Sequence, residues 1–427
     1  MSSGSADPAT TPSPGRSRIG VLVASQLLAG VGVASGIAVG GLLAERLSGT
    51  TAFAGFAQTA AVLGAGVWAI PLARLAGRRD RRWGLGVGYM LAAVGVVMIF
   101  TAVATQVVPL LFLGFGFFGA ATAAGLQARF AATETVSLAY RARAMSFVLW
   151  ATTLGSVAGP NLSQVGSDLG RRLGLEPLTG PYLFSFTAFA LAAAVIGIGL
   201  RPVATSGTAP AASGVAPLGL LAALRGSLRN PVTVLAVVAI TCSHTVMVGV
   251  MVMTPVHMFH DGFSLSLVGL VISFHVLGMY GASPLFGWLT DKVSARGVVL
   301  VAVVVFAAAL AVAASSGTAR FVPMSVALGL LGLGWSAGMI GGSTLLTESV
   351  PVGSRTSMQG ATDAIMNLAA AGSSALSGVV MDLAGFPALG VIAGVVVLPM
   401  AVLAVRFGEA ERATRSGVGT HVDPSNS

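Results

Sequence analysis

The chain has 427 residues, of which 55% are hydrophobic and only 9% are charged, and its mean hydropathy is +0.89. Because a soluble domain carries about 25% charged residues, this composition excludes a soluble fold and indicates a protein that lies in lipid. The net charge of +9 does not indicate nucleic acid as a partner, because the basic residues form no stripe that alternates with aromatic residues. A single cysteine, Cys242, excludes an intrachain disulfide framework and a cysteine zinc site.

The N-terminal segment 1–17 is polar and rich in Ser, Pro, Gly and Thr. It lacks the short apolar core and the small-residue cleavage site of a signal peptide. We therefore expect residues 1–17 to form a disordered tail on the cytosolic side of the membrane.

Twelve apolar runs follow, and each is close to the roughly 20 residues that a helix needs to cross a bilayer. Their apolar residues are continuous and do not alternate with polar ones, which favours helices over the strands of a membrane barrel. The 57 glycines suit helices that pack closely in lipid. The predicted spans are 19–44, 53–73, 83–105, 107–128, 144–163, 182–200, 232–256, 265–288, 298–315, 321–346, 357–381 and 385–405.

The basic residues predict the orientation of these spans. If the N-terminus lies in the cytosol, only Arg46, Arg171, Arg172 and Arg320 among the 23 Lys and Arg fall on the outer side. Lys and Arg favour the cytoplasmic side of a membrane. We therefore expect a multi-pass protein of the cell membrane (inner or plasma membrane) with both termini in the cytoplasm and a basic rim that faces anionic lipid.

The chain divides into two similar halves. Glu134 and Arg141, seven residues apart, parallel Glu348 and Arg355 at the same spacing. Parallel repeats of this kind are typical of secondary transporters. The predicted parts are the N-terminal six-helix half 18–201, a cytosolic linker 202–231 in which Leu218–Arg229 can form a short amphipathic helix, the C-terminal six-helix half 232–406 and a cytosolic tail 407–427.

A short polar loop follows the eighth predicted span. Gly287, Asp291, Lys292 and Arg296 occupy positions in it that resemble the loop signature of the major facilitator superfamily. Ser294 stands where that family has an inner glycine. With the twelve spans, the duplication and the central linker, this resemblance implies an all-α polytopic membrane fold of the major facilitator type, with 12 transmembrane helices in two pseudo-symmetric halves.

The resemblance extends in part to the loop after the second span. Gly77, Arg78 and Arg79 match the family's pattern there, whereas Arg74 and Leu75 replace its acid and its base. The resemblance implies that these loops act as a conformational latch. Asp291 would contact the start of the eleventh helix, near Ser354–Met358, in one transport state only, because a carboxylate is stabilised at a helix N-terminus. The alternative is a basic loop with no role beyond orientation.

The fifth span contains Gly155, Gly159 and Pro160. This arrangement resembles the core of the signature of antiporters in the same superfamily, and it favours export over uptake. The alternative is close packing of helices, since both glycines lie on one helix face.

Few polar or ionisable side chains lie inside the spans, and such residues are candidates for function because burying them in lipid is costly. His244 and His275 each lie near mid-depth and can share one cavity, where a histidine pair can carry a proton. A neutral imidazole bonded to a neighbouring helix is the alternative for each. The full set of candidates for the substrate or proton pathway is His244, His275, Asp363, Asn367, Gln26 and Trp335. On the outer loop, His257, His260 and Asp261 lack a second ligand cluster, so we expect no metal site.

These patterns predict a secondary active transporter that exports a small, largely apolar or weakly polar molecule by alternating access, coupled to protons. No span interior carries a Lys or Arg apart from the boundary residue Arg129, which disfavours multiply charged substrates. The alternatives are an uptake carrier or facilitator and a non-transporting membrane sensor. We expect no enzyme activity, no catalytic residues and no cofactor. The expected partners are a small-molecule substrate, protons and the lipid bilayer, for a protein that acts as a monomer.

Overall fold

The computed structural model describes residues 14–134, 141–200, 229–315, 318–351 and 354–418. This part of the chain is built from helices. In order they are α1 (Pro14–Ser48), η1 (Thr51–Phe53), α2 (Ala54–Arg78), α3 (Arg81–Thr105), α4 (Val108–Phe118), α5 (Ala120–Glu134), α6 (Arg141–Asn161), α7 (Ser163–Arg172), η3 (Pro177–Thr179), α8 (Pro181–Gly199), α10 (Pro231–His260), α11 (Leu265–Gly281), α12 (Ser283–Lys292), α13 (Ala295–Ala314), α14 (Phe321–Ser349) and α15 (Arg355–Val418).

The predicted all-helical membrane fold is confirmed. Among the described residues, 10 helical segments are long and apolar enough to cross a membrane, and the longest, Met358–Arg406, has 49 residues. It bends at Gly385, whose φ of 74° is a left-handed conformation that glycine adopts readily. The two arms of α15 correspond to the last two predicted spans. Together with α6, which has 21 residues, they complete the twelve helices that the sequence predicts.

Two predicted spans are each built from two helices. The span 107–128 changes from α4 to α5 at Gly119. The span 265–288 changes from α11 to α12 just before Pro284, which lies in the first turn of α12. Proline has no backbone N–H and cannot continue the hydrogen-bond ladder of a helix, so the interruption follows from the sequence.

Side chains cap several of the helix starts. The Asp80 carboxylate accepts a hydrogen bond from the backbone N–H of Trp83 at 3.2 Å. Asn230 Oδ1 accepts from the N–H of Val232 at 2.9 Å. Such caps satisfy donors that the first turn of a helix leaves without a partner. These polar residues therefore set where α3 and α10 begin. The predicted amphipathic helix Leu218–Arg229 lies, apart from Arg229, outside the described residues.

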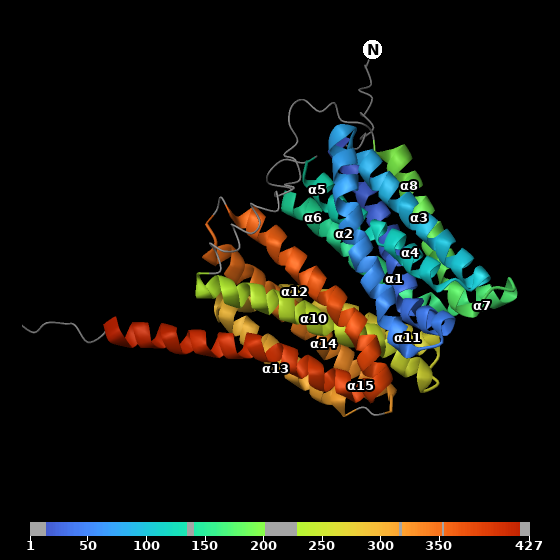
Figure 1. The fold of residues 1–427 in the computed structure, drawn as a ribbon. Coiled ribbons are helices and arrows are strands. Elements are labelled where there is room, and N and C mark those ends of the chain that lie inside the picture. Colours follow the sequence, from blue (N-terminus) through green and yellow to red (C-terminus); the bar gives the residue numbers. More distant parts are fainter. Residues whose placement is uncertain (1–13, 135–140, 201–228, 316–317, 352–353, 419–427) are drawn as a thin grey trace, which may run out of the picture.

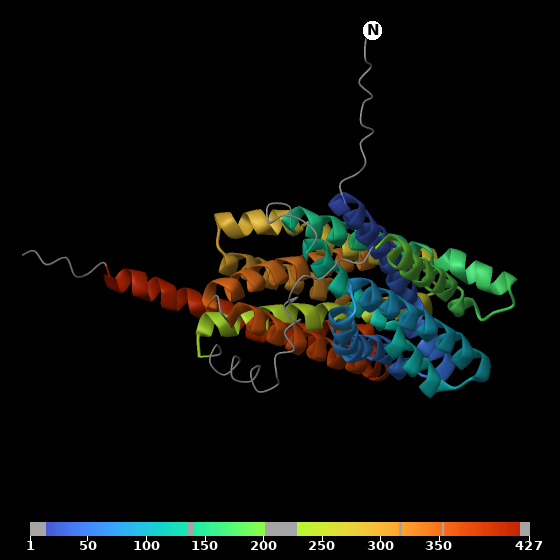
Figure 2. The ribbon, with the colours of Figure 1, turned by 90° about the horizontal axis from the view of Figure 1, so that it is seen from above.

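The helices form two bundles (Figures 1 and 2). In the N-terminal half, α1 packs against α6 and α8. In the C-terminal half, α10 packs against α14 and α15, and α13 packs against α14. The bundles lie side by side at the lower right of Figure 1 and diverge toward the upper left. We call the end at which they meet the closed end, and the opposite end the open end.

The first seam at the closed end joins α2 to the first arm of α15. Thr59 Oγ1 donates to the backbone carbonyl of Ala371, and Ser374 Oγ donates to that of Gly55, both at 2.8 Å. Gly55 and Gly378 permit this approach, because a Cβ atom on either would overlap backbone atoms of the opposing half. Backbone contact at this distance needs small residues.

The second seam joins α6 to α11. Asn161 Nδ2 donates to Ser273 Oγ at 2.6 Å, and Ser273 Oγ lies 3.3 Å from the carbonyl oxygen of Val157. A Cβ on Gly269 would lie 2.5 Å from the carbonyl oxygen of Pro160. Exchanging the two halves converts one seam into the other, since α2 and α11 occupy equivalent places in the repeat, as do α6 and the first arm of α15. The closed end is thus pseudo-symmetric.

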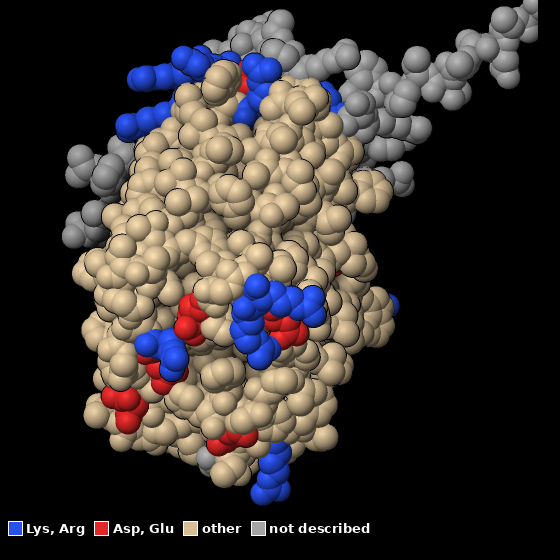
Figure 3. All heavy atoms as spheres, turned by 90° about the vertical axis from the view of Figure 1, so that its right-hand side faces the viewer, with Lys and Arg blue, Asp and Glu red and all other residues tan. Residues whose placement is uncertain are grey.

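The outer surface suits lipid. Large apolar side chains are widely exposed, and Ile198, Leu383 and Val304 reach 86%, 81% and 69%. Water would penalise a surface of this kind, whereas hydrocarbon does not. Figure 3 shows broad areas free of Asp, Glu, Lys and Arg between the places where charged residues gather. The chain is therefore a multi-pass membrane protein.

Candidate functional site

Beyond the closed end, the helix faces that form the α6–α11 seam become exposed. Leu154 and Trp150 lie on the face of Asn161, because seven and eleven residues correspond to about two and three helical turns. They are 54% and 65% exposed. On α11, Tyr280 lies two turns beyond Ser273 and is 40% exposed. The two helices therefore separate toward the open end and leave the facing walls of the halves accessible.

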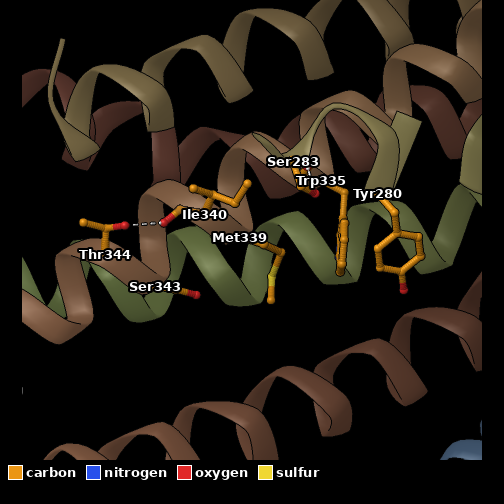
Figure 4. A pocket seen from close by; sticks show the side chains of 8 residues that line it. Tyr280, Ser283, Trp335, Met339, Ile340, Ser343 and Thr344 are labelled. Atoms are coloured by element: carbon orange, nitrogen blue, oxygen red, sulfur yellow. Dashed lines mark hydrogen bonds between the residues drawn. The ribbon is translucent and has the colours of Figure 1, made fainter. Parts of the chain in front are cut away.

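A pocket of about 360 Å³ lies in the wall of the C-terminal half, between α11, α12 and α14. Figure 4 shows that Tyr280, Trp335 and Met339 point to the same side. Trp335 and Met339 are one helical turn apart on α14 and so share a face. The lining residues are Tyr280, Ser283, Trp335, Ser336, Met339, Ile340, Ser343 and Thr344. Most of these side chains are aromatic or carry a hydroxyl, and none of the eight is Asp, Glu, Lys, Arg or His.

The indole of Trp335 is held by two neighbours. Its Nε1–H donates to His244 Nδ1 on α10 at 3.0 Å. Its ring meets that of Tyr280 edge-on, with centroids 5.7 Å apart and planes at 71°. Edge-to-face contact is a favourable arrangement for two aromatic rings. Of the predicted candidates, His244 and Trp335 therefore act together: His244 lies behind the pocket wall and orients the ring that forms it.

Asp363 and Asn367 lie on the first arm of α15. Asn367 is one turn before Ala371 on the face that meets α2, and Asp363 lies one turn further at the edge of that face. Both are exposed, and Asn367 Nδ2 donates to the backbone carbonyl of Asp363 at 2.8 Å. These residues line the wall of the C-terminal half that faces the N-terminal half. Asp363 thus places a carboxylate on an accessible surface between the halves.

His275 is placed differently from His244. It is fully buried in the interface between α11 and α14, and its Nδ1 lies 2.9 Å from the carbonyl oxygen of Leu328. Its Nε2 has no hydrogen-bond partner within the described part of the chain. His275 does not line the pocket, so the two histidines face different neighbours. A role of His275 in the proton pathway stays a prediction.

Gln26 belongs to a buried network in the N-terminal half. Its Nε2 donates to the hydroxyl of Tyr89 at 2.7 Å, and Thr152 Oγ1 donates to its Oε1 at 3.1 Å. Gln26 is 2% exposed. The network ties α1, α3 and α6 together. In this conformation Gln26 lies within the bundle, and its assignment to the cavity wall stays a prediction.

The glycines of the fifth predicted span bring α6 against α1. A Cβ on Gly155 would overlap the backbone of Leu27, and one on Gly159 would lie 2.8 Å from the backbone nitrogen of Ser35. Ser35 Oγ also donates to the carbonyl of Gly159 at 3.1 Å. Pro160 follows inside α6 and meets Gly269 across the second seam. The motif therefore serves close packing, and it also ends at the seam between the halves.

The polar segment that ends α12 and begins α13 lies at the open end. Asp291 and Lys292 are exposed, and Asp291 makes no hydrogen bond or ion pair with a described residue. Arg296 Nε donates to the carbonyl of Ala404 on α15 at 2.7 Å. Gly287, which precedes them in α12, has nothing within 4 Å of where a Cβ would lie. The predicted contact of Asp291 with the start of α15 belongs to the other transport state and stays a prediction.

Ser294 explains how this loop works without the family's glycine. Its φ of 153° and ψ of 159° lie in a region that is essentially restricted to glycine. Its hydroxyl accepts a hydrogen bond from the N–H of Gly297 at 3.0 Å and so caps α13. The loop keeps the backbone conformation that a glycine would supply, and the serine adds a cap.

The first-half loop is organised by an acid that the sequence did not single out. Gly77, Arg78 and Arg79 are exposed, and Asp80 caps α3. The guanidinium carbons of Arg79 and Arg82 lie 4.9 Å and 5.8 Å from the ring centroid of Trp83. Cation–π contact of this kind is favourable by about 0.5–1 kcal/mol at an exposed site.

The outer-loop histidines have protein partners. His257 stacks on Phe386 with ring centroids 4.3 Å apart, and Asp261 accepts a hydrogen bond from the backbone of Ala319. His260 contacts Glu45 of the other half. Among the described residues, no group of three His, Cys, Asp or Glu is placed to hold a metal ion.

Several residues of the site were not predicted from sequence. Tyr280, Met339, Ser343 and the Ser283–Ser336 pair belong to the pocket, and Glu45 pairs with His260. Hydroxyl and aromatic residues are common in membrane helices, so type alone does not mark them. Knowing that α11 and α14 are neighbours would have pointed to Tyr280 and Trp335, which are the aromatic residues nearest to the same depth.

Comparison with known proteins agrees with this architecture. The family model described as Major Facilitator Superfamily matches residues 22–279 and 238–423. The uncharacterized MFS-type transporter YdeG of Bacillus subtilis (strain 168) is 35% identical over 88% of this chain and 89% of its own length. The chain belongs to the major facilitator superfamily and is a transporter of that family by descent.

Two further comparisons add detail. The riboflavin transporter RfnT of Brucella anthropi is 28% identical, over 82% of this chain and 85% of its own length. A solved structure of a bacterial homologue of the human lysosomal transporter Spinster, in an inward-facing and unoccupied conformation, superposes with a TM-score of 0.71. The match covers 92% of this chain and 97% of the other chain at 16% sequence identity, so it supports the fold alone.

Proposed function

We propose that this protein exports a small, largely apolar or weakly polar molecule across the cell membrane, coupled to protons, by alternating access. Both termini lie in the cytoplasm. The open end, which carries Arg78, Arg79, Lys292 and Arg296, faces the cytosol, as basic residues favour that side. The two halves rock about a site near the middle of the membrane, which is how parallel-repeat carriers work.

One observation carries this proposal: the halves join at one end, and an uncharged pocket lies in the exposed wall beyond it. An accessible pocket beside a joined end is what an alternating-access carrier presents in one of its two states. Because no basic side chain lines the pocket, anionic substrates would lose their hydration without gaining a partner. This supports an apolar or weakly polar substrate.

Proton coupling draws on three candidates. His244 contacts the pocket wall, His275 is buried between α11 and α14, and Asp363 lies exposed on α15. Protonation of a carboxylate or imidazole changes its charge within the carrier, and such residues in membrane helices typically serve proton relays. The Gly155, Gly159 and Pro160 motif, through its resemblance to the antiporter signature, supports export.

Export can be tested by accumulation in cells. Cells that express the wild type, the His275→Ala variant or no carrier are loaded with hydrophobic cations, antibiotics and uncharged ring compounds, with and without a protonophore. We expect lower accumulation of at least one compound in wild-type cells, and we expect the protonophore to abolish that difference. Loss of the difference in His275→Ala would assign His275 to the pathway. If the wild type is correctly inserted and alters the accumulation of no compound, the result argues against export.

An uptake carrier is the second candidate. The similarity to a protein named as a riboflavin transporter favours it, since that name describes a nutrient. The same cells, given riboflavin outside, separate the two: uptake predicts higher accumulation, and export predicts lower accumulation. A membrane sensor with this fold would change neither while remaining correctly inserted.

A further inference from the structure

We infer that the pocket between α11, α12 and α14 binds an uncharged, flat aromatic heterocycle, whose ring lies against Trp335 and whose polar edge meets the hydroxyl of Ser343. This inference rests on the proposed transport function and specifies the class of substrate. Three independent features of the pocket carry it.

The first feature is a fixed aromatic wall. Because Trp335 Nε1–H is already used in the hydrogen bond to His244, the indole offers a substrate its ring and no donor. The edge-on contact with Tyr280 fixes the plane of that ring. Met339, one turn along α14, adds a polarisable thioether on the same side (Figure 4). A pre-oriented ring and a thioether favour an aromatic partner.

The second feature is the distribution of hydroxyls. Ser283 and Ser336 bond to each other at 3.1 Å, and Thr344 donates to the carbonyl of Ile340 at 2.9 Å. The hydroxyl of Ser343 makes no hydrogen bond to a described residue, and Ser343 is exposed. It is therefore ready to bond a ligand. The Ser343 hydroxyl beside an aromatic wall suits a ring with a polar edge, and a polyol would need many more partners.

The third feature is the absence of charge on the eight lining residues. A phosphate or carboxylate in this pocket would be desolvated without a cation beside it, which is costly. The volume of about 360 Å³ lies at the small end of the roughly 300–1,000 Å³ of ligand sites. The pocket therefore fits a compact ring system and disfavours large or charged molecules.

Binding can be measured with fluorescent probes on the purified full-length protein in lipid nanodiscs. Lumichrome and acridone are flat and uncharged, have polar edges, and fluoresce. We expect saturable binding of at least one of them, with quenching of its fluorescence where its ring stacks on an indole. Competitors then test the class: riboflavin phosphate adds a charge, ribitol lacks the ring, and 1-adamantanol is uncharged but not flat. We expect each to compete at least about tenfold more weakly.

Variants locate the site. Trp335→Leu removes the ring, and we expect the dissociation constant of the probe to rise about tenfold. Trp335→Phe keeps an aromatic ring and should retain most of the affinity, which separates a lost ring from a misfolded protein. Ser343→Ala should weaken binding severalfold. Trp288→Leu is the matched control, because it removes an indole that is 55% exposed outside the pocket, and it should leave binding unchanged.

The outcomes separate the substrate class from the function. If neither flat probe binds, or if 1-adamantanol competes as well as they do, while the export assay still finds a transported compound, the inferred class is wrong and the transporter stands. If binding survives Trp335→Leu, the ring does not lie in this pocket and the inference fails. If the export assay also finds no compound, the proposed function fails with it.

Discussion

His260 Nε2 and Glu45 Oε1 lie 2.9 Å apart and join the C-terminal half to the N-terminal half at the closed end. The side chains are 43% and 18% exposed, so water and salt weaken their attraction. Thr51 Oγ1 also donates to Glu45 Oε1, which fixes the carboxylate in place. The contact joins the end of α1 to the end of α10, so we expect it to be lost when this end opens.

We expect Glu45→Gln and His260→Gln each to raise the ratio of carriers that are open at this end to carriers that are closed there, by about twofold to fivefold. Partly exposed pairs contribute roughly 0.2–1 kcal/mol. The shift can be measured from the distance between spin labels on cysteines placed at Leu173 and Phe259, in a Cys242→Ser background. The double variant should shift no further than either single variant. Additive shifts would show that the two residues act separately.

Gly55→Val should prevent the first seam from forming, because its side chain would overlap the backbone of Ser374. Overpacking costs about 1–3 kcal/mol, so we expect transport to fall roughly tenfold at normal membrane insertion. Gly66→Val is the matched control on the same helix, since nothing lies within 4 Å of where its Cβ would be. Equal losses in both variants would indicate a general effect on α2.

His244→Leu should release the Trp335 indole. It leaves a donor without its acceptor, at a cost of about 1–3 kcal/mol. With 5-fluorotryptophan in the protein, we expect the fluorine resonance of Trp335 to shift and broaden in His244→Leu. His244→Gln offers another acceptor and should retain a sharp signal. Trp335→Phe assigns the resonance, and an unchanged spectrum in His244→Leu would refute the orienting role.

Ser294→Gly should stabilise the protein. A residue other than glycine in this backbone region costs about 1–3 kcal/mol, whereas replacing a capping serine by glycine costs only about a few tenths. We expect the apparent Tm to rise by roughly 1–3 °C. Ser294→Ala loses the cap and keeps the strained backbone, so its Tm should fall. A fall in both variants would mean that the cap outweighs the strain.

Asp291→Asn should lower transport while insertion stays normal. In this structure Asp291 is exposed, and we expect its carboxylate to contact the start of α15 in the other transport state, where a negative charge at a helix N-terminus gains about 0.3–1 kcal/mol. A transport rate reduced severalfold is the expected result. Transport at the wild-type rate would leave Asp291 with no role beyond orientation of the loop.

Much of the fold was predictable from sequence because lipid imposes one rule. Every backbone polar group must be satisfied within its own segment, so long apolar runs become helices. The breaks within two predicted spans follow from Pro284 and Gly119, and the bend between the last two spans follows from Gly385; all three residues act locally. Trp335 and His244 were also recognisable as candidates, since a polar group within a span is uncommon.

The different contacts of the two histidines inside the spans were not predictable from the sequence. His244 and His275 lie at similar depth, which predicted a shared cavity, yet His244 bonds Trp335 while His275 bonds the backbone of Leu328. Depth along a helix follows from residue number, but the rotation of each helix about its axis depends on its neighbours. Small differences in rotation turn one histidine to the pocket wall and the other into an interface.

A twelve-helix membrane protein with two related halves could be derived from residue order alone, because hydrophobic length and basic loops act along the chain. The helix faces that meet one another became known only from the folded chain. Gly55 touches Ser374, Asn161 bonds Ser273 and Glu45 meets His260, each across a sequence separation that no local pattern encodes. Contacts between helices depend on the packing of all of them together, whereas spanning a membrane depends on each helix alone.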